Sequence, residues 1–541
     1  MTIHRTILTL ALLGLCFSGQ AQTTWPPELI ITPERSNFIK TSTYAEVMQV
    51  IQQVTAKSNL SYVTSMGKSQ EGKNIPLIVL ANPQVSTPAE AKASGKPVIY
   101  IQGNIHAGEV EGKEALLMLL RDILLGQKKD LLDNQIVLFA PIYNTDSNDK
   151  MAQGLRPSQE DSPLETGLRE NSQGLDLNRD GIKHEAFETQ ALFASVINAW
   201  DPQVFVDLHT TNGTWHAYSL TWAPSYHSAG EQGPYSYTKD KMLRAITGTI
   251  HDKYGMFFGP YGDYDLREGW PVKNFYTYNH HPRYLVNQFG LRNRMAILSE
   301  AFAHERFYQR IHSTYTFVYE ILSYTNTHGK EIISVNKQAE ADAIKLVTTQ
   351  AGIARKGVRF KMVSQEKLQP FRTYDYVGTT KADGKPEWLR TGKITTYNDV
   401  NYFGAFEATQ ESTVPRGYII PAKFVSVAEH LRKLGITVQQ LAASKKFSGE
   451  VFHVEKLEHA SRKFEGHFMS TATGSFTPAT QSFKKGDYYV DMAQPLANLI
   501  FYVLEPQSDD GLVTWNFFDA YLEQAGINNH SVDYPVFKYF K

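Results

Sequence analysis

The stretch "GKPVIYIQGNIHAGEVEGKEALLMLLRDILLG", residues 95–126, predicts a strand, a short turn and a helix in direct succession. Residues 98–103 are largely apolar and follow Pro97, as expected for a buried strand. Residues 111–126 place Leu and Met on one face and end at a glycine, which is typical of a helix. His106 and Glu109 lie in the turn. Because ligands of open α/β sheets bind at the carboxyl ends of strands, this turn is a candidate site.

The His-x-x-Glu pattern carries little information by itself. A chain with 17 histidines contains about one such match by chance. This chain has a second match, His328 to Glu331, in the polar stretch "TNTHGKE". No predicted strand leads into that stretch, so we expect His328 to lie in a solvated turn.

Further apolar strands alternate with helical stretches along the first two thirds of the chain. The strands are expected within residues 73–83, 134–144, 202–211 and 293–302. This order predicts an α/β fold with a mixed, mostly buried central sheet flanked by helices. After about Gly329, short strand-like pieces dominate, the last being "ANLIFYVLE", and one helix, "SVAEHLRKLGI", interrupts them. We therefore expect a catalytic domain at residues 22–344 and a smaller β-rich domain at residues 345–541.

Composition excludes several classes of protein and of site. The net charge of −1 provides no basic field for nucleic acid. Residues 1–21 have a short basic start, an apolar stretch and small residues before Ala21, as in a cleaved signal peptide. We expect a periplasmic or secreted protein without a stable membrane anchor, because no later apolar run is long enough to span a bilayer. Cys16, the only cysteine, lies in this leader, so a metal site must use His, Asp or Glu.

The ends of two more predicted strands supply residues that a metal hydrolase needs. The strand in residues 202–211 ends near His209, and the strand in residues 293–302 ends near Glu300. Two histidines and one glutamate, here His106, His209 and Glu109, form the protein ligands of a catalytic zinc site with one open position. A further carboxylate that does not bind the metal, Glu300, could serve as general base.

With these residues the sequence resembles the zinc carboxypeptidases of the carboxypeptidase A type, the funnelin metallopeptidases. His106, Glu109 and His209 match the His-x-x-Glu…His ligand pattern, and "RENSQGLDLNRD" (residues 169–180) matches the family's Arg…Asn-Arg stretch. "GKSQEGKNIPLIVL" (residues 67–80) is similar to an upstream strand of the family. The resemblance covers residues 36–324, and "SDDGLVTWNFFD" (residues 508–519) is similar to a bacterial subgroup with an added C-terminal domain.

The resemblance implies a carboxypeptidase-like fold and one Zn²⁺ per chain, held by His106, Glu109 and His209. Glu300 would take a proton from the attacking water and pass it to the leaving amine, and Arg169 would stabilise the developing oxyanion. Asn178 and Arg179 would bind the terminal carboxylate of a peptide substrate. The family's mobile tyrosine would correspond to Tyr278, although Tyr276 and Tyr284 are close in the sequence and no local motif selects among the three.

The resemblance leaves two other functions open. Asp180 stands where the family has asparagine, and its negative charge beside Arg179 keeps open a zinc amidase or deacylase acting on acyl-amino acids or cell-wall peptides. A non-catalytic binding protein on the same scaffold is the third possibility, and the C-terminal domain could itself be a surface or glycan adaptor.

Two other groups of polar residues are not predicted to bind a metal ion. His280 and His281 precede Pro282 in an aromatic loop and are not expected to form a second metal site. Asp509-Asp510-Gly511 lacks the other ligands of a calcium loop.

Overall fold

A computed structural model describes residues 25–159, 163–227 and 229–541. The predicted signal peptide, residues 1–21, and Cys16 lie outside the described residues.

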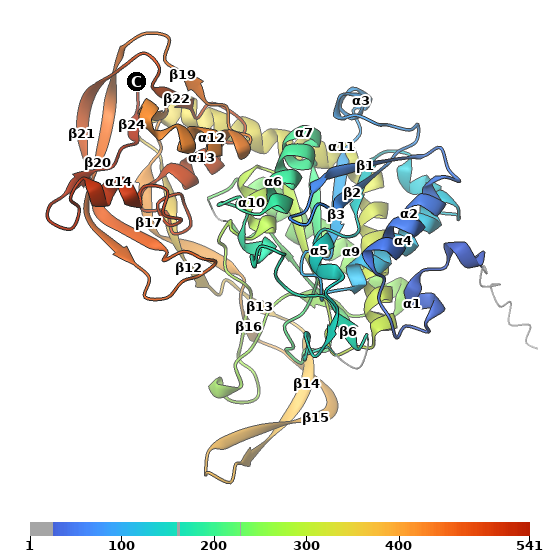
Figure 1. The fold of residues 1–541 in the computed structure, drawn as a ribbon. Coiled ribbons are helices and arrows are strands. Elements are labelled where there is room, and N and C mark those ends of the chain that lie inside the picture. Colours follow the sequence, from blue (N-terminus) through green and yellow to red (C-terminus); the bar gives the residue numbers. More distant parts are fainter. Residues whose placement is uncertain (1–24, 160–162, 228) are drawn as a thin grey trace, which may run out of the picture.

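A mixed sheet of eight strands forms the centre of the first two thirds of the chain (Figure 1). Its spatial order is β1-β2-β4-β3-β7-β11-β8-β9. The strands are β1 (Ser61–Lys68), β2 (Asn74–Leu80), β3 (Val98–Gly103), β4 (Ile136–Ala140), β7 (Val204–Thr210), β8 (Leu220–Pro224), β9 (Phe258–Pro260) and β11 (Met295–Ala301). β4, β3, β7 and β11 are parallel neighbours at the centre. The predicted strands account for these four and β2, and the fold class is confirmed.

Helices cover both faces of the sheet because successive side chains of a buried strand point to opposite faces. In β3, Ile99 and Ile101 pack into one hydrophobic cluster, and Tyr100 packs into another. The first cluster includes residues of α2 (Tyr44–Thr55), α4 (Glu111–Leu124), α9 (Arg244–Tyr254) and α11 (Phe307–Gln350). The second includes residues of α3 (Pro88–Ser94), α6 (Phe187–Leu192), α7 (Asn198–Trp200) and α10 (Leu285–Leu291). The result is a three-layer arrangement of helix, sheet and helix.

The chain after α11 is rich in antiparallel strands. They are β12 (Arg355–Val363), β13 (Glu366–Leu368), β14 (Phe371–Thr380), β15 (Pro386–Tyr397), β16 (Val400–Phe403), β17 (Ala405–Thr413), β18 (Gly417–Ile420), β19 (Gln439–Gln440), β20 (Lys445–His459), β21 (Ser470–Phe483), β22 (Tyr488–Asp491), β23 (Val532–Asp533) and β24 (Phe537–Tyr539). β14 and β15 form a long hairpin that projects from the body of the molecule (Figure 1). The helix predicted in "SVAEHLRKLGI" is α12 (Val425–Lys433).

The strand prediction for "ANLIFYVLE" was wrong, because these residues form helix α13 (Ala497–Leu504). All eight residues of α13 are buried in one core with α12 and the β-rich region. A short run that is apolar on every side is compatible with a buried helix as well as with a buried strand, so periodicity could not separate the two.

The turn predicted around His328 was also wrong, because α11 continues through it. His328 Nδ1 lies 3.1 Å from the carbonyl oxygen of Tyr324, and the two rings stack with centroids 4.1 Å apart. Gly329 packs against Pro97, where an added Cβ would approach Pro97 Cγ to 2.7 Å. Gly329 therefore allows a close contact between α11 and the residue before β3.

The two halves of the chain share contacts. The core of the β-rich region includes Ala343 and Val347 of α11, and β16 pairs in parallel with β10 (Asn274–Tyr276). The predicted division between residues 344 and 345 falls inside α11 and stays a prediction. No helix within the described ranges combines the length and apolar character needed to cross a bilayer.

The contact at Gly329 predicts an unusual response to alanine. Gly329→Ala should lower stability although alanine favours a helix by up to about 1 kcal/mol over glycine, because its Cβ meets the rigid Pro97 ring. Gly248→Ala in α9 is the matched control, since nothing lies within 4 Å of a Cβ there, and it should raise stability. Urea unfolding midpoints test this, and a shift of both variants in the same direction would contradict the packing argument.

Candidate metal centre and active site

The turn between β3 and α4 is held in shape by Asn104 and by two glycines. Asn104 has a positive φ of 65°, which asparagine tolerates better than most residues, and its side-chain amide donates to the carbonyl oxygen of Ala107. A Cβ at Gly103 would lie 2.9 Å from the backbone of Gly112, and a Cβ at Gly112 would lie 2.7 Å from Leu208. The start of α4 can therefore lie directly against β3 and β7.

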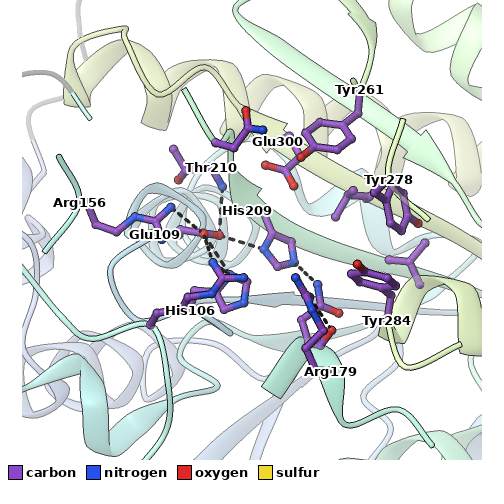
Figure 2. A pocket seen from close by; sticks show the side chains of 15 residues that line it. His106, Glu109, Arg156, Arg179, His209, Thr210, Tyr261, Tyr278, Tyr284 and Glu300 are labelled. Atoms are coloured by element: carbon purple, nitrogen blue, oxygen red, sulfur yellow. Dashed lines mark hydrogen bonds and ion pairs between the residues drawn. The ribbon is translucent and has the colours of Figure 1, made fainter. Parts of the chain in front are cut away.

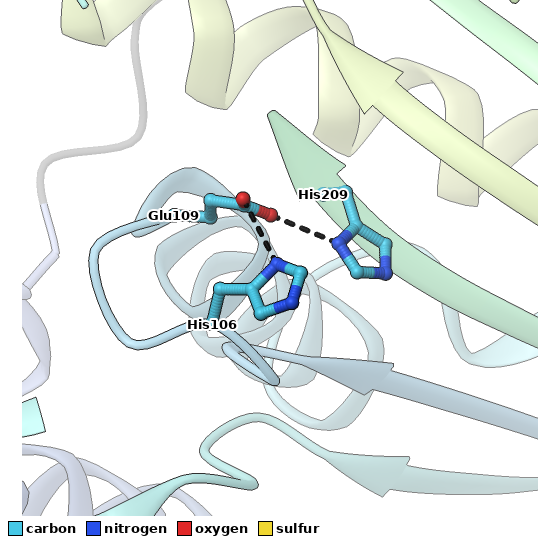
Figure 3. Close-up of side chains that lie close together, drawn as sticks. All are labelled: His106, Glu109 and His209. Carbon is cyan, nitrogen blue, oxygen red and sulfur yellow. Dashed lines mark hydrogen bonds and ion pairs between the residues drawn. The ribbon is translucent and has the colours of Figure 1, made fainter. Parts of the chain in front are cut away.

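His106, Glu109 and His209 converge at the carboxyl ends of β3 and β7 (Figure 3). His106 Nδ1 lies 3.0 Å from one oxygen of Glu109, and His209 Nδ1 lies 2.9 Å from the other. All three side chains are buried. Two imidazole nitrogens and a carboxylate are suitable ligands for Zn²⁺, so the residues present fit a catalytic zinc site.

The second nitrogen of each imidazole faces another carboxylate. His106 Nε2 lies 3.0 Å from Asp176 Oδ1, and His209 Nε2 lies 3.0 Å from Asp207 Oδ2. Gln102 donates to the other oxygen of Asp207 over 3.0 Å. A carboxylate that accepts from Nε2–H, as Asp176 can from His106, leaves the Nδ1 lone pair free for a metal and orients the ring. Asp207 Oδ2 lies close to His209 Nε2 but has no hydrogen-bond partner in the described structure.

Glu300 lies beside His209 because of the strand register. β7 and β11 are parallel neighbours, and Glu300 is paired with His209 across them. Burial raises the pKa of Glu300 to about 8, and the nearby Glu109 carboxylate adds to the rise although His209 opposes it. The position and the pKa suit a carboxyl group that exchanges a proton near neutral pH.

Two arginines lie close to Glu109. Arg156 Nη2 is 2.8 Å from Glu109 Oε1, and Arg169 Nη1 is 3.7 Å from the same oxygen. Arg169 also bonds to Asp176 Oδ2 through Nε and Nη2, at 3.1 and 2.9 Å. Gly108 makes room for Arg156, since a Cβ there would lie 2.8 Å from Arg156 Cγ. The two guanidinium groups place positive charge at the edge of the His106, Glu109 and His209 group.

Arg179 lies on the other side of the histidines from Arg156 (Figure 2), and Asn178 precedes it in the chain. Asn178 Nδ2 is 3.5 Å from His209 Nε2, and its Oδ1 accepts from the backbone of Leu285. The Arg179 guanidinium lies over the ring of Tyr284, 4.4 Å from its centroid, and donates to the carbonyl oxygen of Asn178. Stacking on an aromatic face holds the planar guanidinium in one orientation.

Asp180 is directed away from this group. It is fully buried, lies 3.1 Å from Lys183 Nζ, and accepts from the backbone N–H groups of Glu185 and Ala186. Burial raises the pKa of Asp180 although Lys183 opposes the rise. This carboxylate therefore stabilises the turn before α6 and does not repel an anion bound at Arg179.

These side chains surround one cavity of about 320 Å³. Its lining residues are His106, Glu109, Arg156, Arg169, Asn178, Arg179, His209, Thr210, Asn212, Tyr261, Tyr278, Tyr284, Val286, Leu298 and Glu300. Tyr278 lines the cavity, and its hydroxyl donates to Asn287 Oδ1 over 3.1 Å. Tyr276, in contrast, donates to Glu268 on the exposed side of β10 and does not line the cavity.

The β-rich region reaches this site. Glu465, in the turn between β20 and β21, accepts from the backbone N–H of Asp176 over 3.0 Å. His467 Nε2 lies 2.9 Å from Glu185. The segment that carries Asp176, Asn178 and Arg179 is therefore bounded by residues far away in the sequence.

Comparison with known proteins agrees with this geometry. Residues 47–281 match the zinc carboxypeptidase family. The matched stretch contains His106, Glu109 and His209. Carboxypeptidase 2 of Trichophyton rubrum is 22% identical over 523 residues, covering 91% of this chain and 86% of that protein. Human carboxypeptidase D is 24% identical over 249 residues, covering 42% of this chain and 16% of that protein.

Among solved structures, a putative carboxypeptidase A from Shewanella denitrificans is similar over 54% of this chain and 71% of its own, with 14% identity and a TM-score of 0.40. The protein is a zinc carboxypeptidase, a hydrolase that uses zinc, as the sequence resemblance predicted. The roles of the individual site residues stay predictions.

Sequence reasoning missed several residues of this zinc carboxypeptidase site. Asp176 and Asp207 each lie two positions before a predicted site residue, Asn178 and His209, and period-two spacing in a strand could have revealed Asp207. Arg156 and Tyr261 come from loops, and no local motif marks them.

The outer carboxylates predict a test of metal affinity. Asp176→Asn should weaken zinc binding by about 10–100-fold, because a neutral amide oxygen is a weaker acceptor for His106 Nε2–H than the carboxylate and orients the ring less firmly. Chelator competition on purified protein measures the affinity. Glu165→Gln, a change of an exposed acid before the same segment, is the control and should leave the affinity unchanged. Equal affinities in all three proteins would show that Asp176 does not support a metal ligand.

Proposed function

We propose that this zinc carboxypeptidase removes residues from the free carboxyl end of peptides, with His106, Glu109 and His209 as zinc ligands and Glu300 as general base. The observation that carries the proposal is a single cavity in which Glu300 and Arg179 lie on different sides of His209 (Figure 2). Glu300 on one side can activate water, while Arg179 on the other binds the terminal carboxylate of the substrate.

Zn²⁺, when bound, supplies a Lewis acid that polarises the scissile carbonyl and makes water more acidic. Glu300 accepts the proton of the attacking water and delivers it to the leaving amine. Its burial supports this role, because a carboxyl group with a raised pKa gains and loses a proton near neutral pH. Arg169, which is 36% exposed and lies at the cavity wall, donates to the oxyanion that forms on the carbonyl oxygen.

Asn178 and Arg179 hold the terminal carboxylate of the substrate. The planar guanidinium of Arg179 can donate two parallel hydrogen bonds to a carboxylate, and the Asn178 amide lies next to it. This contact fixes the scissile bond at the last residue. The buried position of Asp180 removes the observation that favoured an amidase or deacylase over a peptidase.

The remaining parts of the chain have supporting roles in this proposal. Residues 22–344 carry the catalytic machinery, and residues 345–541 support the wall of the cavity, as the contact of Glu465 with Asp176 suggests. Residues 1–21 direct export, so the peptides cleaved are periplasmic or extracellular. Tyr278 closes over the bound substrate.

Replacing Glu300 tests the general base. Glu300→Gln should lower kcat by about 10²–10⁴-fold while zinc content stays at the wild-type level, because only the proton acceptor is lost. Mass spectrometry of a mixed peptide library, together with zinc quantification, provides both readouts. Glu305→Gln, which removes the charge of a partly buried acid bonded to Ser219 after the same strand, is the control. Undiminished cleavage by Glu300→Gln would refute the assignment, and absence of cleavage by the wild type would favour the non-catalytic binding protein.

Replacing Arg179 tests the exopeptidase specificity. Arg179→Gln should lower kcat/KM for peptides with a free carboxyl end by about 10–100-fold, the loss expected for hydrogen bonds to a charged group. Peptides with an amidated carboxyl end should be poor substrates of the wild type and should be affected little by the substitution. An enzyme that cleaves both forms equally well would be an endopeptidase or an amidase.

A further inference from the structure

A second group of metal-binding side chains lies where the loop before α10 meets the segment after α13. One ligand atom from each of His280, His281 and Asp509 lies within 4.8 Å of the other two, the same closeness that His106, Glu109 and His209 show. None of His280, His281 and Asp509 lines the catalytic cavity. The group is therefore separate from the site described above and combines two elements that are far apart in the sequence.

The distance between His280 and Asp509 is compatible with two ligands of one metal ion. His280 Nε2 lies 3.3 Å from Asp509 Oδ2. That separation is longer than the usual 2.7–3.2 Å of an N–H···O hydrogen bond. Two ligands at about 2.0–2.2 Å from one tetrahedral zinc ion are separated by about 3.3 Å. A simple ion pair would also require only one imidazole, yet the ring of His281 lies 4.7 Å from the ring of His280.

The surroundings orient Asp509 and balance the nearby charge. Tyr502 donates its hydroxyl to Asp509 Oδ1, and the backbone N–H of Phe360 donates to Oδ2 over 3.0 Å. The guanidinium of Arg283 is the nearest cation in sequence, and Asp510 neutralises it through contacts of 2.7 and 2.9 Å. Arg283 therefore pairs with Asp510, and the carboxylate of Asp509 can interact with a cation bound at His280 and His281.

Protein hydrogen bonds do not satisfy the polar atoms around buried His280 completely. Within the described residues, His280 Nδ1 and His227 Nε2 are buried without a hydrogen-bond partner. The His227 ring lies 5.3 Å from that of His280, and its Nδ1 accepts from the backbone N–H of Ala229. Its Nε2 must then carry the hydrogen as a buried donor. Unsatisfied buried polar atoms of this kind are rare in folded proteins. The N–H of His227 requires an acceptor such as water, so it does not itself face the proposed cation.

We propose that His280, His281 and Asp509 bind one divalent transition-metal ion of the zinc class, in addition to the catalytic zinc. Histidine nitrogen and carboxylate oxygen are ligands that suit such an ion. The ion would join the loop that carries Tyr278 and Tyr284 into the catalytic cavity to the C-terminal region. Its role would be to fix one wall of that cavity. The proposal does not depend on the proposed exopeptidase specificity.

Metal stoichiometry of the full-length protein tests the second site. After saturation with Zn²⁺ and removal of free metal, elemental analysis should give two zinc ions per chain for the wild type. His281→Asn and Asp509→Asn should each bind one. His251→Asn, at an exposed position of α9, is the matched control and should keep two. One zinc ion in the wild type, or two in both cluster variants, would overturn the proposal.

A second measurement keeps the cluster intact and removes the catalytic site instead. His209→Asn should still bind one zinc ion, and Zn²⁺ should raise its Tm, because a ligand that binds only the folded state stabilises it. The double variant His209→Asn/His281→Asn should bind none and show no shift. A His209→Asn protein whose Tm does not respond to Zn²⁺ would overturn the second site, and it would leave the catalytic assignment untouched.

Discussion

The buried carboxylate of Glu109 is the group that side chains from several elements of the site contact. Each of its oxygens faces the Nδ1 atom of a histidine from a different strand end, and Arg156 contacts one of them. Burying a carboxylate is costly unless it is paired. Burial opposes ionisation, but His106 and Arg156 hold the pKa of Glu109 well below its usual range. Gly103 and Gly112 lack side chains, so α4 can pack closely against β3 and β7, and this packing brings the residues of the site together.

The sequence predicted the centre of this site because parallel strands deliver their ends to one edge of a sheet. His106, His209 and Glu300 each lie at or near such an end, and the register places Glu300 beside His209. Arg156 and Tyr261 could not be predicted in the same way. A loop without a local motif positions Arg156, and Tyr261 directly follows the short edge strand β9, which the sequence did not predict. The two errors in secondary structure, at His328 and in α13, arose where tertiary packing determined a conformation that local polarity did not reveal.

The C-terminal region takes part in the architecture of the site. Glu465 accepts from the backbone of Asp176, which is itself bonded to His106, so one chain of contacts connects the turn after β20 with a candidate metal ligand. β16 pairs in parallel with β10, the strand that precedes the loop carrying Tyr278 and Tyr284. The buried His430 of α12 contacts the carbonyl oxygen of Ile182 over 2.8 Å, close to the Asn178-Arg179 turn. Because the C-terminal region contacts the site through several elements, it limits how far the loops around the cavity can move.

The charges in the cavity show which arginine can bind an anionic substrate. Arg156 is engaged by Glu109, and Arg169 is engaged by Asp176 through two of its nitrogens. Arg179 differs from both, because its closest carboxylate contact in the described chain is 3.9 Å, to Asp176 Oδ2, and its plane rests on Tyr284. A guanidinium has five N–H donors, and of these three arginines only Arg179 has no carboxylate within hydrogen-bond distance in the described chain. We therefore propose that the negative end of a peptide binds at Arg179, on the side of His209 away from Glu300, so that the bond next to that end faces the proposed general base.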